Sequence, residues 1–250
     1  MVRKLGWLAI GGLGIGIVAL SLAAELGADD RAGWRLGEIF STATSCWGDG
    51  DGNADANATE RHWPWDGGDT LEIAVPATVR YRGGSADEVV ARGSPDVIAH
   101  LRVRGGKIDL PCSPRGFGRR GLDITLPGRP FRTVTIVGSS DLIMDAVNQP
   151  SLDLSITGSG SVHAQGTSDR VTLSIAGAGS AKLADLTMKR FDVHIAGTGD
   201  IEAGPQDEIN VNIAGSGQVR LLSDPAQVHT NIIGSGSVAR ASARSGDRSK

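Results

Sequence analysis

Apolar and polar residues alternate over short stretches of the C-terminal half of the chain, and these stretches recur at a nearly constant interval. Each stretch has three residues, the middle one polar, and a glycine follows closely. The clearest examples are Leu154-Ser155-Ile156, Leu173-Ser174-Ile175, Val193-His194-Ile195, Val211-Asn212-Ile213 and Thr230-Asn231-Ile232. Strict alternation predicts a β-strand with one buried face. The second half is therefore expected to be a series of short strands.

The glycines that follow these strands define an internal repeat. Gly138, Gly158, Gly177, Gly197, Gly215 and Gly234 open similar segments and are separated by 20, 19, 20, 18 and 19 residues. Such a period predicts an all-β solenoid, a parallel β-helix whose coils of about 19 residues stack roughly 4.8 Å apart. Glycine suits the bend between strands, where φ is positive or backbones approach closely. An antiparallel sandwich or barrel is the rival fold, but its hairpins would not repeat residue types at one phase.

Stacked coils would place equivalent residues in columns. Alternation puts Ile156, Ile175, Ile195, Ile213 and Ile232 in one internal column. After each turn the outward positions are His163, Lys182, Glu202 and Arg220. The alternating charges of the last three would be mildly favourable at strand spacing. This outward row is a candidate binding surface.

The preceding part of the chain also predicts strands, without a fixed period. They are expected at residues 71–75, 79–82, 97–103, 107–110, 122–126 and 134–137. Glycine and proline separate nearly all of them. The folded domain is expected to cover residues 63–241, after a linker at 25–62 that is rich in Gly, Asp and Asn, with a polar tail at 242–250.

The first residues indicate export. Arg3 and Lys4 precede an uncharged, largely apolar run at residues 5–24. Residues 1–24 therefore read either as a cleaved signal peptide or as a transmembrane anchor, since about 20 helical residues span a bilayer. Either alternative predicts an exported domain, in the periplasm, tethered to the inner membrane or at the cell surface.

Composition narrows the function classes. The formal net charge is -3 and 40% of the residues are hydrophobic, so no global basic field points to nucleic acid and a sizeable core is possible. The chain has only two cysteines, Cys46 and Cys112. In an exported chain this even count favours one structural disulfide over two free thiols.

One segment of the linker has the spacing of a calcium loop. Asp49, Asp51, Asn53, Asp55 and Glu60 stand at positions 1, 3, 5, 7 and 12 of that pattern. Ala54 replaces the glycine that the loop's sharp turn needs, and no clear helices flank the segment. A solvated acidic linker is the favoured interpretation, and no cofactor is expected unless calcium binds here.

The residues present no convergent catalytic centre. The acids and histidines of the repeats lie at scattered phases, and no nucleophile elbow or nucleotide loop is recognisable. A basic group made of Arg102, Arg104, Lys107, Arg115, Arg119 and Arg120 could meet an acidic polysaccharide or an anionic lipid. A solvated surface is the simpler interpretation of these charges.

Several segments together resemble the GIN-domain family, described as bacterial autotransporter adhesin heads. They are Trp63-Pro64-Trp65, the segment from Gly67 to Leu71, the segment from Val75 to Tyr81, and the Gly-Ser-Gly turns between Gly158 and Ser237. The resemblance covers residues 63–241 and implies a right-handed parallel β-helix in an extracytoplasmic bacterial protein. Since no stretch after Ala241 could form a translocating barrel, a periplasmic or membrane-tethered domain is expected rather than self-export.

Three classes of function remain in view. The leading expectation is a non-enzymatic module that binds a glycan, a protein or an envelope component. The alternatives are a carbohydrate-active β-helix enzyme and a structural or sensory partner domain of a membrane protein. The ligand and the oligomeric state stay open at this point.

Overall fold

The computed structural model describes residues 57–112 and 121–240. All of them belong to one compact unit of the chain, residues 43–250. Strands hold 68% of the described residues and helix holds 3%. The all-β solenoid that the repeat predicts is thus confirmed.

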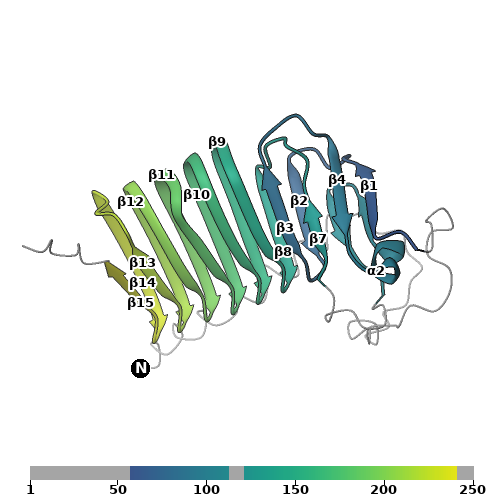
Figure 1. The fold of residues 1–250 in the computed structure, drawn as a ribbon. Helices are drawn as coiled ribbons and strands as arrows, with labels where there is room; N and C mark the ends of the chain where they lie inside the picture. The colour runs from purple at the N-terminus through teal and green to yellow at the C-terminus, as the bar shows by residue number, and fades with distance from the viewer. Residues whose placement is uncertain (1–56, 113–120, 241–250) are drawn as a thin grey trace, which may run out of the picture. The chain divides into compact units, whose positions relative to one another are not determined.

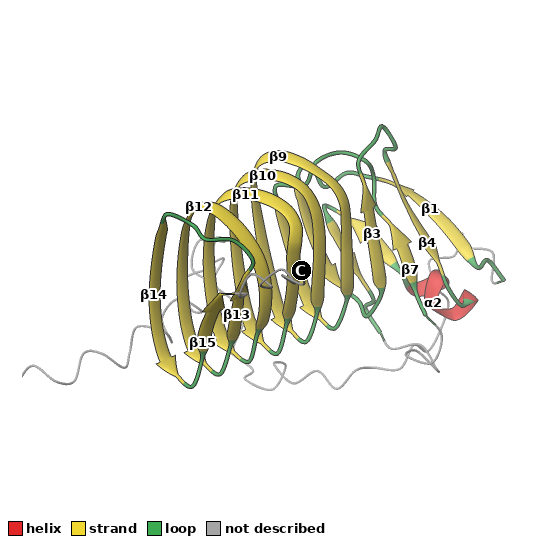
Figure 2. Cartoon of the chain, turned by 60° about the vertical axis from the view of Figure 1, so that its left-hand side comes forward, coloured by secondary structure: helices red, strands yellow, loops and turns green. Residues whose placement is uncertain are grey.

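Four long strands form the regular part of the solenoid. They are β9 (Asp141–Gly158), β10 (Ser161–Gly177), β11 (Ser180–Gly197) and β12 (Asp200–Gly215). Each pairs in parallel with the next, so successive coils lie side by side in Figures 1 and 2. Short separate strands within each coil were expected; instead one strand of 16 to 18 residues continues around the coil. A register shift near Gly166 interrupts the ladder between β9 and β10.

Three shorter strands follow β12, two in the next coil and one that begins the coil after it. These are β13 (Gln218–Leu221), β14 (Gln227–Gly234) and β15 (Ser237–Arg240). Strands β13 and β14 both pair in parallel with β12, and β15 pairs with β13. The solenoid has about five turns.

The repeated glycines lie at bends with positive φ and close backbone approach, as the sequence predicts. Gly177 has φ +126°, a conformation that side chains with a Cβ rarely adopt. A Cβ atom at Gly177 would also lie 2.4 Å from the carbonyl oxygen of Gly158 in the preceding coil. That oxygen accepts a hydrogen bond of 2.8 Å from the backbone N–H of Ala178. Glycine therefore lets each turn approach the turn below it.

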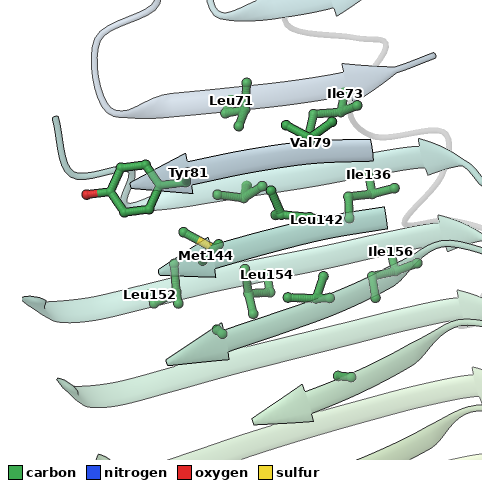
Figure 3. Packing of buried hydrophobic residues seen from close by; sticks show 14 of the residues in the cluster. Leu71, Ile73, Val79, Tyr81, Ile136, Leu142, Met144, Leu152, Leu154 and Ile156 are labelled. Atoms are coloured by element: carbon green, nitrogen blue, oxygen red, sulfur yellow. The ribbon is translucent and has the colours of Figure 1, made fainter. Parts of the chain in front are cut away.

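The core consists of columns of aliphatic side chains, as Figure 3 shows for the first coils. Ile73 pairs with Ile136 and Ile136 with Ile156, and all three are buried. The isoleucine column continues from Ile156 through Ile175, Ile195 and Ile213. Its last member, Ile232, remains in register but is 37% exposed, since no further described coil covers it.

The N-terminal part of the described chain combines a first parallel coil with antiparallel additions. Its strands are β1 (Glu60–Pro64), β2 (Thr70–Ala74), β3 (Thr78–Arg82), β4 (Glu88–Arg92), β5 (Arg102–Arg104), β6 (Lys107–Asp109), β7 (Asp123–Thr125) and β8 (Thr133–Gly138). Strands β2, β3 and β8 join the parallel stack. Strand β4 pairs antiparallel with β1 and β7, and β5 pairs antiparallel with β6. The core of this part includes an aromatic cluster, in which Phe131 is edge-on to Trp65 and Tyr81 with 5.3 and 5.7 Å between ring centroids.

The prediction of a single strand at residues 97–103 is wrong. That stretch lies mostly in a helix, α2 (Pro95–His100), followed by β5. Pro95 occupies the first turn, where its missing N–H costs nothing, and Asp96 suits the positive end of the helix. Val97 and Ile98 are both buried although they are adjacent, which a half-buried strand could not achieve.

No helix within residues 57–112 and 121–240 is long and apolar enough to cross a membrane. The segment for which an anchor or signal peptide is predicted, residues 1–24, lies outside the described residues.

Candidate functional site

The structure brings the four residues of the predicted outward row together. His163, Lys182, Glu202 and Arg220 occupy matching positions on β10, β11, β12 and β13. Neighbouring members are therefore separated by one strand spacing, about 4.8 Å. We call this set the outer row; its role in binding remains a prediction.

Charges in the outer row are only partly paired. The Arg220 guanidinium donates a hydrogen bond to the Glu202 carboxylate. His163 reaches no closer than 4.0 Å to a carboxylate, that of Asp185. Among the described residues Lys182 makes no ion pair, although Glu202 follows it in register. Of the ion pairs expected from the alternating charges of the outer row, only the one between Glu202 and Arg220 forms.

An open groove lies beside the paired end of the outer row. It has a volume of about 320 Å³. Its lining residues are Asp200, Ile201, Glu202, Gln218, Val219, Arg220, Ser237 and Ala239. Since β12, β13 and β15 run in parallel through it, their outward side chains project in two rows of three: Asp200, Gln218 and Ser237, then Glu202, Arg220 and Ala239. We call this feature the ladder groove.

The ladder groove offers several kinds of hydrogen-bonding groups within a small area. Asp200 and Glu202 supply carboxylate acceptors, Arg220 supplies donors, and the Gln218 amide and Ser237 hydroxyl supply both. They stand on a sheet whose inward residues, Ile201 and Val219, are buried in the core. The backbone positions of these groups are therefore fixed before any ligand arrives.

A second groove, of about 410 Å³, lies at another corner of the coils. It is lined by Pro150, Asp169, Arg170, Lys189, Arg190 and Asp207. Opposite charges largely satisfy one another there. Lys189 lies 2.8 Å from Asp169, and Arg190 lies 2.7 Å from Glu208.

The electrostatics of the second groove favour a stable ion-pair network. Hydrogen bonds from Asn210 and Arg190 lower the pKa of Glu208, against the smaller effect of its desolvation. The hydrogen bond to Asp169 raises the pKa of Lys189. Each group thus keeps its charge over a wider pH range. Arg170 forms no such ion pair within the described chain. Its neighbour in register is Arg190, which is also a cation.

Sequence reasoning missed this second groove, although the repeat contains a signal for it. Asp169-Arg170, Lys189-Arg190 and Asp207-Glu208 are charged pairs separated by 20 and 18 residues. These intervals match those of the glycines. Their recurrence at the repeat interval indicates that these charged pairs share one corner of the coil.

The remaining candidates fall partly outside the described residues. Arg115, Arg119 and Arg120 lie at 113–120, outside the described residues, so the basic group stays a prediction. Arg102 and Arg104 are exposed on β5. Lys107 lies 2.9 Å from Glu72, and that hydrogen bond raises the pKa of Lys107.

The predicted calcium loop and disulfide can be followed at one residue each. Asp49, Asp51, Asn53 and Asp55 lie outside the described residues, whereas Glu60 lies in β1. Its carboxylate accepts hydrogen bonds from Arg92 and lies 3.1 Å from His62. In the described part of the chain no group of three or more His, Cys, Asp or Glu side chains is arranged so that it could hold a metal ion. Cys46 is outside it, so its pairing with Cys112 remains a prediction.

Several solved structures are similar to this chain. A "putative adhesin" from Bacteroides fragilis superposes with a TM-score of 0.58 at 16% identity, over 73% of this chain and 96% of that chain. Another "putative adhesin", from Parabacteroides distasonis, gives a TM-score of 0.47 at 17% identity, over 79% and 99%. A "putative lipid binding protein" from the same organism gives 0.43 at 20% identity, over 74% and 98%. The first likeness establishes the fold and not a ligand.

Sequence comparison gives a more specific result. No curated protein matches the chain. The profile of one family, described as "Putative auto-transporter adhesin, head GIN domain", matches residues 69–225. This is more than half of the 250 residues and spans the strands from β2 to the loop after β13. The chain belongs to this family of adhesion-type modules, the GIN-domain adhesin heads.

Proposed function

We propose that this protein is a non-enzymatic, exported adhesion module that binds a glycan through the ladder groove. The observation that carries the proposal is the set of outward polar side chains on three adjacent parallel strands, Asp200, Glu202, Gln218, Arg220 and Ser237, beside an open groove. Family membership supports an adhesive role.

A glycan fits the chemistry of the groove. Sugar hydroxyls both donate and accept hydrogen bonds. Planar carboxylate, amide and guanidinium groups can each hydrogen-bond to two hydroxyls at the same time. The strand spacing of about 4.8 Å places at least one outward polar side chain on each successive strand along the solenoid axis. A linear polymer could therefore contact successive coils.

A carbohydrate-active enzyme is the second candidate, for one specific reason. Asp200 and Glu202 point outward from alternate positions of one strand, so their Cα atoms lie about 6 to 7 Å apart. Glycosidases use two carboxyl groups at comparable separations. Two observations favour binding instead. The Glu202 carboxylate is engaged by Arg220, and the groove is open to water on a flat sheet.

An array of glycans and polysaccharides, probed with the purified full-length chain, separates the two candidates. Retained protein reports binding, and newly formed reducing or unsaturated ends report cleavage. We expect saturable retention on a limited class of glycans with no new ends. Cleavage that disappears in Asp200→Asn would overturn the non-enzymatic assignment, and retention on none of the glycans would overturn the ligand class.

Export is a separate part of the proposal and has its own test. The basic residues Arg3 and Lys4 before the apolar run at 5–24 support it. We expect the domain in cells to be digested by added protease only after the outer membrane is permeabilised. The mass of the isolated chain then distinguishes a cleaved signal peptide from a retained anchor. Resistance to protease until the inner membrane is lysed would contradict export.

A further inference from the structure

The edge strands of the described sheet are β1, β5, β14 and β15, and they differ in how they are protected. At one end β1 carries Glu60, Arg61 and Pro64, and its partner in the described chain is β4 alone. Charges and proline on an edge strand oppose pairing with another chain, since the charge must stay hydrated and proline lacks a donor. At the other end β14 has the sequence QVHTNIIG, with no lysine, carboxylate or proline. That edge has none of these protections.

The C-terminal edge also exposes the inside of the solenoid. Val228, Thr230 and Ile232 stand in register with Ile209, Val211 and Ile213, which are buried. They are thus the last members of the internal columns, yet Val228 is only half-buried and Ile232 is 37% exposed. Ile233, on the outward side, is 69% exposed. In the described chain β14 pairs with β12 alone, which leaves its second edge without a strand.

The residues after Arg240 are poorly suited to cover this edge. The stretch Ala241-Ser242-Ala243-Arg244 and the six residues after it contain no aliphatic side chain larger than alanine. Such a segment could not extend columns made of valine and isoleucine. The occupant must bring large aliphatic residues at alternate positions.

A second copy of β14 meets that requirement. In an antiparallel pair, directly opposed residues point to the same side of the sheet. Pairing two β14 strands about a two-fold axis at Thr230 sets Val228 opposite Ile232 of the other copy, both on the core side. His229 then faces Asn231 on the outer side, and residues 227–233 all find partners. The register that covers most of the strand is therefore also the one that extends the apolar columns.

We propose that the protein self-associates into a two-fold dimer by antiparallel pairing of β14, centred on Thr230. A two-fold contact uses the same strand of both copies, and the other edge strands of the described sheet, β1, β5 and β15, all carry charged residues, so the assembly closes at two copies and does not grow into a fibre. The dimer places two ladder grooves on one rigid body. This inference does not depend on the glycan proposal, because it uses a different strand and a different chemistry.

Cysteine cross-linking tests the register directly on the full-length chain in mild detergent. In the proposed pair the two Thr230 Cα atoms lie about 4.5 to 5.5 Å apart, within disulfide reach. The two Asn231 Cα atoms would lie roughly 8 Å apart, beyond that reach. Under mild oxidation Thr230→Cys should form a covalent dimer in high yield, whereas Asn231→Cys and the unaltered chain should not.

Light scattering after size exclusion supplies the second measurement. The unaltered chain should have the mass of two copies, and Ile232→Lys should have the mass of one, because it places a charge in the joined column. Leu222→Lys, which alters an exposed leucine outside β14, should remain dimeric and shows whether any added lysine dissociates the chain.

Several results would overturn the proposal. A monomeric unaltered chain would do so, including one whose β14 amides are protected from hydrogen exchange by a segment of the same chain. So would a dimer in which Thr230→Cys and Asn231→Cys cross-link equally, or one that Ile232→Lys leaves intact.

Discussion

At the scale of single residues, the fold depends on glycines that cannot be replaced by any residue with a Cβ atom. Gly158, Gly177 and Gly197 occupy one position in successive coils, all with positive φ. Each would direct a Cβ atom at the backbone of the coil below. The conformation and the close approach thus select glycine independently.

Replacing Gly177 by alanine should lower the free energy of unfolding by about 3 kcal/mol, because strain at φ +126° and a contact of 2.4 Å act together. Gly84 is the matched control, since a Cβ atom there would meet nothing within 4 Å. Gly84→Ala should change the free energy by no more than about 0.5 kcal/mol. Chemical denaturation of the two variants provides the comparison. Equal losses would show that the turn glycines are not required by the close approach.

At the scale of elements, a charged network fixes the edge strand β1 to β4. The Nδ1 and Nε2 atoms of His62 each lie 3.1 Å from a carboxylate oxygen, of Glu88 and Glu60 respectively. Both nitrogens can donate only when the ring is protonated. Arg92 donates two further hydrogen bonds to Glu60. The hydrogen bond with Glu88 raises the pKa of His62 above its ordinary 6.5, and the one from Arg92 lowers the pKa of Glu60.

The stabilisation by His62 should therefore depend on pH. A folded-state pKa that is raised gives a contribution that is complete below the unfolded pKa of about 6.5 and is lost as the pH rises through the folded value. The unfolding free energies of the unaltered chain and His62→Gln should differ most below the unfolded pKa of about 6.5 and converge at alkaline pH, above the raised folded pKa. The group is exposed, so the difference is expected to be small. A difference that grows toward alkaline pH would contradict this network.

Elements inside the repeat were predictable, and elements outside it were much less so. The column from Ile156 to Ile213 followed from the sequence because every coil repeats the same alternation and the same glycine. Helix α2 did not, because Val97, Ile98, Leu101 and Val103 suit a strand as well as a helix over so few residues. Strand β4 was missed, since its partners β1 and β7 pair antiparallel outside the regular stack and no period indicates them.

At the scale of the whole molecule, the described coils place polar groups in register on an open surface. The sequence predicted that Glu202 and Arg220 would share an outward row, because strand alternation and coil length determine it. It could not predict which members of the row would pair. That choice depends on side-chain reach, and Lys182 remains apart although Glu202 stands beside it in register. The candidate site therefore includes only Glu202 and Arg220 of the outer row, the members nearest β15.

The central claim is that the ladder groove binds the ligand. It is tested most directly by the affinity of the array-selected glycan for the purified full-length chain and three variants, measured by titration calorimetry. Arg220→Gln and Glu202→Gln should each weaken binding about tenfold or more, since a hydrogen bond to a charged group contributes roughly 1.5 to 3 kcal/mol. Asp169→Asn, in the second groove, is the matched control and should bind like the unaltered chain. Undiminished affinity in both groove variants, or a loss confined to Asp169→Asn, would contradict the assignment.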